Sequence, residues 1–286
     1  MRRLLRPLGL LLVLALLLPG SAWALAIGTF NIEFFNVSGR DRYVDDDLRH
    51  LARSIRESGA DVLALQEIAD AASLRYFLQK ELPRWKFALH HGGSNQNLAF
   101  IWNGETIDLR GQAEPHFGRE TFSWKGRELN LFDRPPLAAT FVDKETGRSF
   151  TLVNVHLKSQ STQGKADKME AYLYNEFKRG RQILRVNELA SALEGTRFVL
   201  GDFNIETVVG SAFPLLTLQE GHSFDNLGVN IDHIGYLAID PDETWRLEET
   251  ETAIPRRSTA RRQRPDHDII VLHFEWPDEA EGGMKR

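Results

Sequence analysis

The sequence contains no cysteine among its 286 residues. Disulfide bonds, thiolate metal centres and cysteine nucleophiles are therefore excluded. The chain also has no internal repeat, no low-complexity linker and no excess of positive charge, because 40 acidic residues outnumber 35 basic ones. A net acidic chain is not a general binder of polyanions. Any surface that binds anions must therefore be a local one.

A long apolar run occurs only near the start of the chain. Residues 1–24 combine a basic beginning, an apolar run over 8–18 and the small-residue signal Ala22-Trp23-Ala24. This order is typical of a secretory signal peptide that is cleaved after Ala24. The alternative, a membrane anchor, needs about 20 apolar residues, and this run is shorter. We expect an exported protein, periplasmic or secreted, whose mature form does not span a membrane.

Short apolar runs bounded by turn residues predict buried strands along the rest of the chain. We expect strands within residues 25–35, 61–68, 97–103, 136–143, 149–159, 197–204, 230–239 and 267–276. Helices are expected over 45–59 and 167–194, where apolar residues recur at helical spacing. The pattern predicts one α/β domain over 25–277, followed by a flexible acidic tail over 278–286.

Polar side chains stand at the ends of these apolar runs. They are Asn31, Glu33, Glu67, His156, Asp202, Asn204, Asp232, Asp266 and His267. For any single one, a strand terminator or a solvated side chain is a sufficient interpretation. Turn chemistry does not ask for Glu67 or His156, however. Residues two apart on a strand face the same side, so Asp202 and Asn204 are expected to share one site.

The polar stretches occur in a specific order along the chain: TFNIE, LALQE, NVHLKS, GDFN, IDHI and PDHD. This order resembles the endonuclease/exonuclease/phosphatase superfamily, the deoxyribonuclease-I-like fold, over nearly the whole mature chain. The resemblance implies an α/β protein of the α+β type, built as a two-sheet β-sandwich flanked by helices. It also implies a divalent-metal-dependent phosphoesterase.

The resemblance assigns metal binding to Glu67, with Asn31 beside it. Mg²⁺, or alternatively Mn²⁺, suits such a site because Mg²⁺ prefers one or two carboxylates and keeps several waters and phosphate oxygens as ligands. Glu33 either assists at the metal or is a solvated strand residue. Asp266 is expected on the opposite side of the chain from His267, reaching the metal region.

The resemblance also assigns catalytic roles. His267 is the candidate general base, oriented by Asp232, because a histidine titrates near neutrality. Asp202 would help to position the attacking water, and Asn204 would donate a hydrogen bond to a phosphoryl oxygen. His156 would contact the phosphate or assist the leaving group. This histidine matches the deoxyribonuclease, sphingomyelinase and inositol-phosphatase branches, and not the abasic-site endonucleases.

Two further positions leave alternatives open. Arg134 stands where deoxyribonuclease-like members keep a phosphate-binding arginine, or it caps a turn before a proline pair. The glutamate that partners the first histidine in deoxyribonucleases is absent, and Asn95 or Asn97 could substitute. The remaining candidates, His90, His91 and His233, are expected to be ordinary histidines, with His233 facing away from its neighbour Asp232.

A basic loop precedes His267 in this acidic chain. Its arginines are Arg256, Arg257, Arg261, Arg262 and Arg264. A basic run is usually only solvated, but its position beside the site favours a role in holding phosphates of a nucleic acid. We therefore expect a monomeric, non-specific nuclease. The alternatives are a sphingomyelinase-like or small phosphoester hydrolase, and a catalytically inactive binding or toxin-like module.

Overall fold

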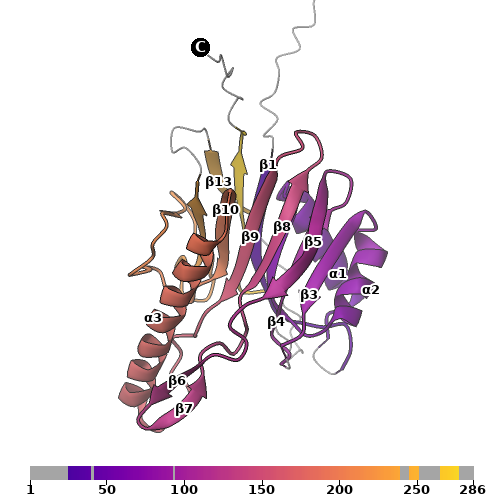
Figure 1. Ribbon diagram of the computed structural model, residues 1–286. Helices are drawn as coiled ribbons and strands as arrows, with labels where there is room; N and C mark the ends of the chain where they lie inside the picture. The colour runs from indigo at the N-terminus through magenta and orange to yellow at the C-terminus, as the bar shows by residue number, and fades with distance from the viewer. Residues whose placement is uncertain (1–24, 40–41, 93, 239–244, 251–264, 277–286) are drawn as a thin grey trace, which may run out of the picture.

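Two six-stranded β-sheets form the centre of the protein and pack face to face (Figure 1). The computed structural model describes residues 25–39, 42–92, 94–238, 245–250 and 265–276. An apolar layer lies between the sheets, to which Ile27 and Phe100 contribute from one sheet and Phe150 and Phe198 from the other. The expected two-sheet sandwich is confirmed.

The first sheet has the strand order β13-β14-β1-β2-β4-β3. Its strands are β1 (Leu25–Phe35), β2 (Val62–Ile68), β3 (Trp85–His90), β4 (Asn97–Asn103), β13 (Trp245–Thr250) and β14 (Ile269–Phe274). Only β1 and β2 are parallel neighbours in this sheet. Because parallel strands end on the same side, the residues that follow β1 and β2 meet at one edge.

The second sheet has the order β11-β12-β10-β9-β8-β5. Its strands are β5 (Ile107–Pro115), β8 (Leu137–Asp143), β9 (Ser149–His156), β10 (Thr196–Asp202), β11 (Leu215–Leu216) and β12 (Asp232–Leu237). Here β9 and β10 form the parallel pair. A separate hairpin consists of β6 (Thr121–Trp124) and β7 (Arg127–Asn130).

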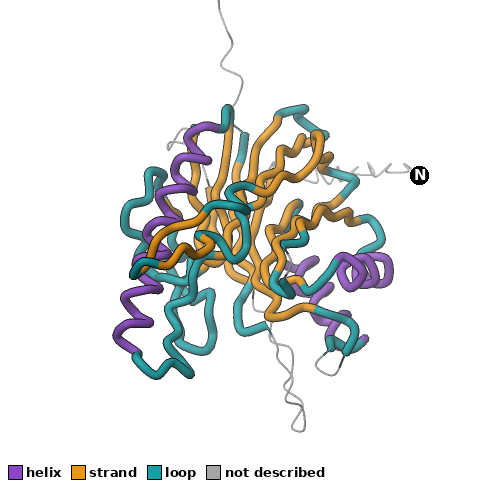
Figure 2. Tube along the Cα trace, turned by 60° about the horizontal axis from the view of Figure 1, so that its bottom comes forward, coloured by secondary structure: helices purple, strands orange, loops and turns teal. Residues whose placement is uncertain are grey.

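The helices cover the outer faces of the sandwich (Figure 2). Helices α1 (Asp45–Glu57) and α2 (Ala71–Glu81) pack on the first sheet, and α3 (Lys168–Ala192) packs on the second. The central strands are therefore buried on both faces. This explains why the sequence shows them as continuous apolar runs and not as an alternating pattern.

The sequence analysis missed α2 and the strands β3, β5, β6, β7, β11 and β13. Strands β3 and β5 lie at sheet edges and have no continuous apolar run, so backbone pairing with β4 and β8 holds them in place.

The described residues do not include the expected leader 1–24, the arginines of 251–264 or the acidic tail, so export remains a prediction. Within the described residues, no helix is both long and apolar enough to cross a bilayer.

Candidate active site

One cavity of about 940 Å³ lies where strand ends of both sheets meet. Its walls contain every described residue that the sequence analysis placed in the site, except Asp232. These residues are Asn31, Glu33, Glu67, Arg134, His156, Asp202, Asn204, Asp266 and His267. The fold thus gathers side chains that are up to 236 positions apart in the chain, from Asn31 to His267.

Backbone pairing aligns the centre of this site. His156 lies opposite Asp202 in the parallel pair β9/β10, and Asp202 lies opposite Asp232 in the antiparallel pair β10/β12. Gly201 permits this close pairing, since its φ is +144° and a Cβ there would lie 2.0 Å from the carbonyl oxygen of Val155. Only glycine adopts this conformation without strain. The glycine of GDFN is therefore required by the geometry of the site.

Left-handed backbone is concentrated around the cavity. Four non-glycine residues of its lining have positive φ: Glu33 (28°), Phe34 (49°), Glu67 (61°) and Asn204 (57°). Such conformations are strained and collect at functional sites. They also correct the sequence analysis. Asn204 lies beyond the end of β10, and the register of β1 shifts after Asn31, so a turn brings Asn204 to the cavity and an irregularity of β1 brings Glu33 there, in place of regular strand alternation.

Asp202 is the central carboxylate of the site. Its Oδ2 lies 3.1 Å from Asn31 Nδ2, 3.4 Å from His156 Nε2 and 4.0 Å from His267 Nε2. Its Oδ1 accepts the backbone N–H of Asn204 at 2.7 Å. Burial raises the pKa of Asp202 to about 7, against the opposing attraction of His267.

His267 is fixed by Asp232, as the sequence analysis expected. Its Nδ1 lies 2.7 Å from Asp232 Oδ2, which leaves Nε2 toward the cavity. Burial alone would lower the pKa of His267, but the charge and hydrogen bond of Asp232, together with Asp202 and Asp266, raise it to about 10. The raised pKa favours the protonated imidazole at neutral pH. In this form the imidazole is a proton donor, whereas the sequence analysis expected a general base.

His156 has the opposite charge state. Burial lowers its pKa well below the ordinary value, helped by the positive charges of Arg134 and His267. Its Nε2 faces Asp202 and lies 3.8 Å from Glu67 Oε1, whereas its Nδ1 has no hydrogen-bond partner among the described residues. The surroundings thus favour the neutral form of His156 and the protonated form of His267.

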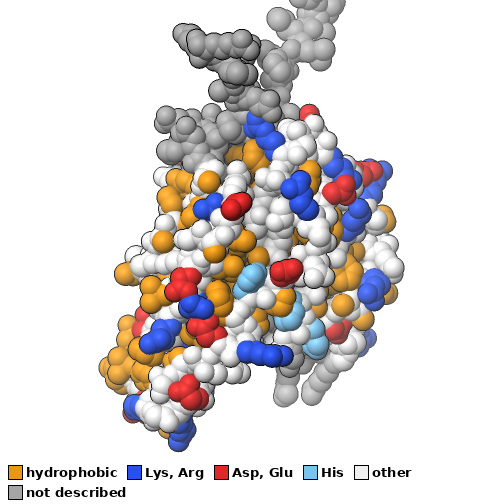
Figure 3. All heavy atoms as spheres, viewed as in Figure 1, with side chains coloured by type: hydrophobic (Ala, Val, Ile, Leu, Met, Phe, Trp, Pro, Cys, Tyr) orange, Lys and Arg blue, Asp and Glu red, His pale blue; other side chains and the backbone are white. Residues whose placement is uncertain are grey.

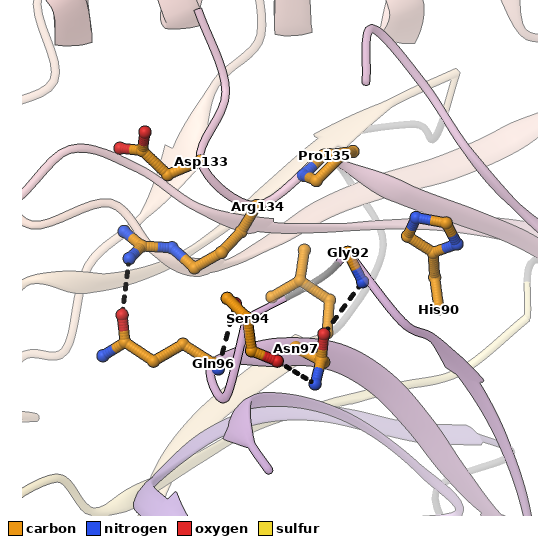
Figure 4. A pocket seen from close by; sticks show the side chains of 9 residues that line it. His90, Gly92, Ser94, Gln96, Asn97, Asp133, Arg134 and Pro135 are labelled. Carbon is orange, nitrogen blue, oxygen red and sulfur yellow. Dashed lines mark hydrogen bonds between the residues drawn. The ribbon is translucent and has the colours of Figure 1, made fainter. Parts of the chain in front are cut away.

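Neither candidate asparagine partners His156. Asn97 connects several backbone segments by hydrogen bonds. Its Nδ2 donates to the carbonyls of Ile68, Ala69 and Ser94. Its Oδ1 accepts the N–H of Gly92 at 2.9 Å (Figure 4). Asn95 is exposed. The suggested replacement for the missing glutamate is therefore wrong, because the amide of Asn97 is already used by backbone groups.

Arg134 lies at the edge of the cavity, where Gln96 binds its guanidinium (Figure 4). The distance from Arg134 Nη1 to Gln96 Oε1 is 2.9 Å. Nη2 donates to the carbonyl of Leu157 at 3.0 Å, and Nε donates to that of His156 at 3.4 Å. These bonds fix the guanidinium beside His156 and still leave N–H groups for a phosphate, because arginine has five.

Glu67 and Asn31 offer oxygen donors at the ends of the neighbouring parallel strands β1 and β2. Glu67 Oε2 accepts the N–H of Phe34 at 3.1 Å, and Asn31 Oδ1 accepts that of Glu33 at 3.1 Å. One carboxylate and one amide fit Mg²⁺, which retains waters, better than a metal that needs a closed cage. Within the described residues there is no cluster of three or more His, Cys, Asp or Glu that could hold a metal ion.

Asp266 differs from its expected orientation. Its Oδ1 lies 3.8 Å from His267 Nε2, so the two neighbours face the same cavity and not opposite sides. Asn226 Nδ2 donates to Oδ2 of Asp266. The backbone explains the shared direction, because His267 forms a single bridge with Phe224 and does not belong to the regular strand β14.

The sequence analysis missed Lys158, which also lines the cavity. Gln182 Oε1 accepts its backbone N–H at 2.8 Å, and Arg179 donates to its carbonyl at 2.6 Å. Burial lowers the pKa of Lys158, and no carboxylate among the described residues pairs with its Nζ at salt-bridge distance. Its position two residues after His156 was the signal in the sequence that could have identified Lys158.

His233 behaves as expected: it is buried, and its Nε2 lies 2.7 Å from the carbonyl of Ile205.

Comparison with known proteins agrees with this geometry. A profile described as the Endonuclease/Exonuclease/phosphatase family matches residues 28–234. No curated protein matches the chain in sequence.

Solved structures share the fold at low sequence identity. A humanised TDP2 of D. rerio with 14 mutations is 16% identical, with a TM-score of 0.63, covering 88% of this chain and 99% of that one. D. rerio TDP2 complexed with single-strand DNA product gives the same values. A mannosyl-6-phosphatase of Bacteroides thetaiotaomicron is 17% identical, with a TM-score of 0.55, covering 88% of this chain and 100% of that one.

Proposed function

The chain belongs to the endonuclease/exonuclease/phosphatase family, and from this premise we propose that it is a divalent-metal-dependent phosphodiesterase acting on nucleic acid. One observation carries the proposal. Asp202 lies between the Nε2 atoms of His156 and His267, at 3.4 and 4.0 Å, in the wall of an accessible cavity. A carboxylate that can hold a water, beside an oriented proton donor, is what hydrolysis of a phosphoester requires.

The residues divide the work of hydrolysis as follows. A bond forms between the water oxygen and phosphorus while the bond from phosphorus to one ester oxygen breaks. Asp202 holds the water and takes its proton, and His267, oriented by Asp232, gives a proton to the departing oxygen. The proton on Asp202 then returns to His267. Asn204 uses one N–H on the carbonyl of Leu157 at 3.2 Å and keeps the other for a phosphoryl oxygen.

Glu67 and Asn31 would hold the metal. A bound Mg²⁺ or Mn²⁺ supplies stabilisation of the negative charge on the phosphoryl oxygens. Lys158 and Arg134 add positive charge on the other side of His156, where they would bind the same phosphate or the next one.

Two features favour nucleic acid over a small phosphomonoester. The cavity of about 940 Å³ is much larger than one phosphate, and part of its lining is apolar, with Phe224, Leu227 and Val229. An apolar wall beside cationic groups suits a base next to a phosphate. The D. rerio TDP2 structure with single-strand DNA product shows that a protein with this fold binds DNA. We also propose that the protein acts as a monomer after export.

The test compares substrates with the purified mature chain. Plasmid DNA, RNA, sphingomyelin and mannose 6-phosphate are each incubated with Mg²⁺ or with EDTA. We expect cleavage of nucleic acid with Mg²⁺ only, abolished by His267→Ala and retained by His91→Ala, an exposed histidine that does not line the cavity. Turnover of sphingomyelin or sugar phosphate alone would overturn the substrate proposal. Full activity in EDTA would overturn the metal dependence, and no turnover at all would indicate a binding module.

A further inference from the structure

The first half of helix α3 has an unusual distribution of side chains, with polar and charged groups buried and apolar groups exposed, whereas the second half buries Ile183, Val186 and Leu189. Its buried residues include Asn175, Lys178, Arg179 and Gln182, all exposed by 3% or less. Its outward residues include Met169 (66% exposed), Tyr172 (48%), Leu173 (51%), Phe177 (40%) and Leu184 (57%). A surface helix normally shows the reverse order. Each of the two faces therefore needs its own explanation.

The buried polar face is explained by the cavity wall that it holds. Lys178 Nζ binds both carboxylate oxygens of Asp133 at 2.8 Å. Gln182 and Arg179 bind the backbone of Lys158 on both sides. Buried polar groups with satisfied hydrogen bonds are stable. Of the outward apolar residues, Phe177 packs against the ring of Trp124, but this contact does not explain the exposure of Met169, Leu173 and Leu184.

The outward residues form one continuous stripe, which we call the α3 ridge and define as Met169, Tyr172, Leu173, Phe177 and Leu184. Met169, Leu173 and Phe177 are four positions apart, and Leu184 follows two turns later, so all lie along one side of the helix. Gly180 lies between Phe177 and Leu184 and places no side chain on this surface. Figure 3 shows hydrophobic side chains gathered at the lower left, over α3. Contiguous apolar surface of this kind marks an interaction site.

Positive charge flanks the α3 ridge. Among the described residues, no carboxylate forms an ion pair with Lys165, Lys168 or Arg181, although Arg181 lies over the Phe177 ring at 5.1 Å. The acids of the helix are already neutralised, since Glu170, Glu176 and Glu188 each form an ion pair with a lysine or arginine. The ridge is therefore a cationic and apolar surface on a chain whose formal net charge is −5.

We propose that the α3 ridge docks on the surface of an anionic lipid bilayer. Interfacial helices insert an apolar face about 5–10 Å deep and place lysine and arginine among the headgroups. Nucleic acid offers little to the aliphatic side chains of Met169, Leu173 and Leu184. A second copy of the chain would need about 800 Å² on each partner and would bring two sets of unpaired cations together. A bilayer instead offers apolar depth and negative charge to the same helix.

Docking would hold the cavity close to the membrane. Residues 158–163 line the cavity, and α3 begins at Lys168, only a few residues later. The β6–β7 hairpin supports the ridge, because Trp124 packs against Phe177 with ring centroids 5.2 Å apart. This inference does not depend on the substrate, and its test needs no turnover.

The test measures sedimentation of the mature chain with vesicles, one kind made of phosphatidylglycerol and phosphatidylcholine in equal parts, the other of phosphatidylcholine alone. We expect binding to the anionic vesicles. Leu173→Ser combined with Leu184→Ser should weaken it at least about tenfold, since both exposed leucines lose apolar burial. Lys168→Gln combined with Arg181→Gln should weaken binding to the anionic vesicles by about fivefold for each charge removed. This effect should be seen at low salt and disappear at high salt, where the attraction between charges is screened.

Matched controls are Val209→Ser, an exposed apolar residue outside the ridge, and Arg53→Gln, an exposed arginine on α1; both should bind normally. Circular dichroism confirms that each variant is folded. Wild-type protein that fails to sediment with anionic vesicles overturns the proposal, as do ridge variants that bind as tightly as wild type. A wild-type dimer in solution that dissociates in the leucine variant, without lipid binding, would assign the ridge to a second copy instead.

Discussion

The position of Asp232 beside His267 favours the protonated imidazole, and this effect can be measured without substrate. The change is Asp232→Asn in protein kept in EDTA. Asp232 is the main group that raises the pKa of His267, and its Oδ2 lies 2.7 Å from Nδ1. The variant keeps the shape of the side chain and removes its charge. Burial, which lowers the pKa of His267, then opposes only Asp202 and Asp266.

The magnitude follows from the two pKa values. The difference between 6.5 and about 10 corresponds to about 5 kcal/mol of preference for the charged imidazole. Because the folded-state pKa is raised, this stabilisation is fully present below pH 6.5 and is lost as the pH rises through about 10. The difference in unfolding free energy between wild type and Asp232→Asn should therefore be largest below pH 6.5 and shrink toward pH 10.

The assay is an NMR titration of the imidazole nitrogens, with urea unfolding at several pH values. We expect wild-type His267 to stay protonated past neutral pH and the variant to titrate several units lower. Asp225→Asn is the control, since this exposed aspartate pairs with His222, 3.1 Å away, and not with His267. A wild-type His267 that titrates near 6.5 in EDTA would refute the reasoning, as would an Asp232→Asn variant with an unchanged titration.

Three further predictions concern single positions. Glu67→Gln should lose nuclease activity by orders of magnitude and bind Mg²⁺ more weakly in isothermal titration calorimetry, because the proposed site has one other protein ligand; unchanged Mg²⁺ affinity would contradict the assignment. Asn97→Ala should lower the unfolding free energy by about 2–3 kcal/mol in urea, because several buried backbone groups lose a partner. Gly201→Ala should be destabilised by about 3 kcal/mol or more in the same assay, since its methyl group would lie 2.0 Å from the carbonyl oxygen of Val155.

The sequence by itself determined the central strands and indicated most of the charged side chains that the structure gathers at the cavity. Runs such as VLALQEI and SFTLVNVH are apolar on both faces because helices cover one side and the second sheet covers the other. A buried strand must end in a turn, and a glutamate or histidine at that end has no structural reason to be there. Glu67 and His156 could be identified for this reason, and the structure brings both to the cavity.

Only the tertiary structure decided the charge states, orientations and supports. The pKa of His267 depends on Asp232 and Asp202, which are distant in the sequence, as well as on its neighbour Asp266, so no local pattern encodes it. Asn204 and Glu33 reach the cavity through left-handed backbone, in a turn after β10 and at a register shift within β1, and these local conformations override strand alternation. The apolar stripe that predicted α3, which includes Ile183, Val186 and Leu189, is buried against the second sheet as expected. No local pattern showed that Arg179 and Gln182 are buried as well, because they bind the backbone of Lys158, which lies 21 and 24 positions earlier in the sequence.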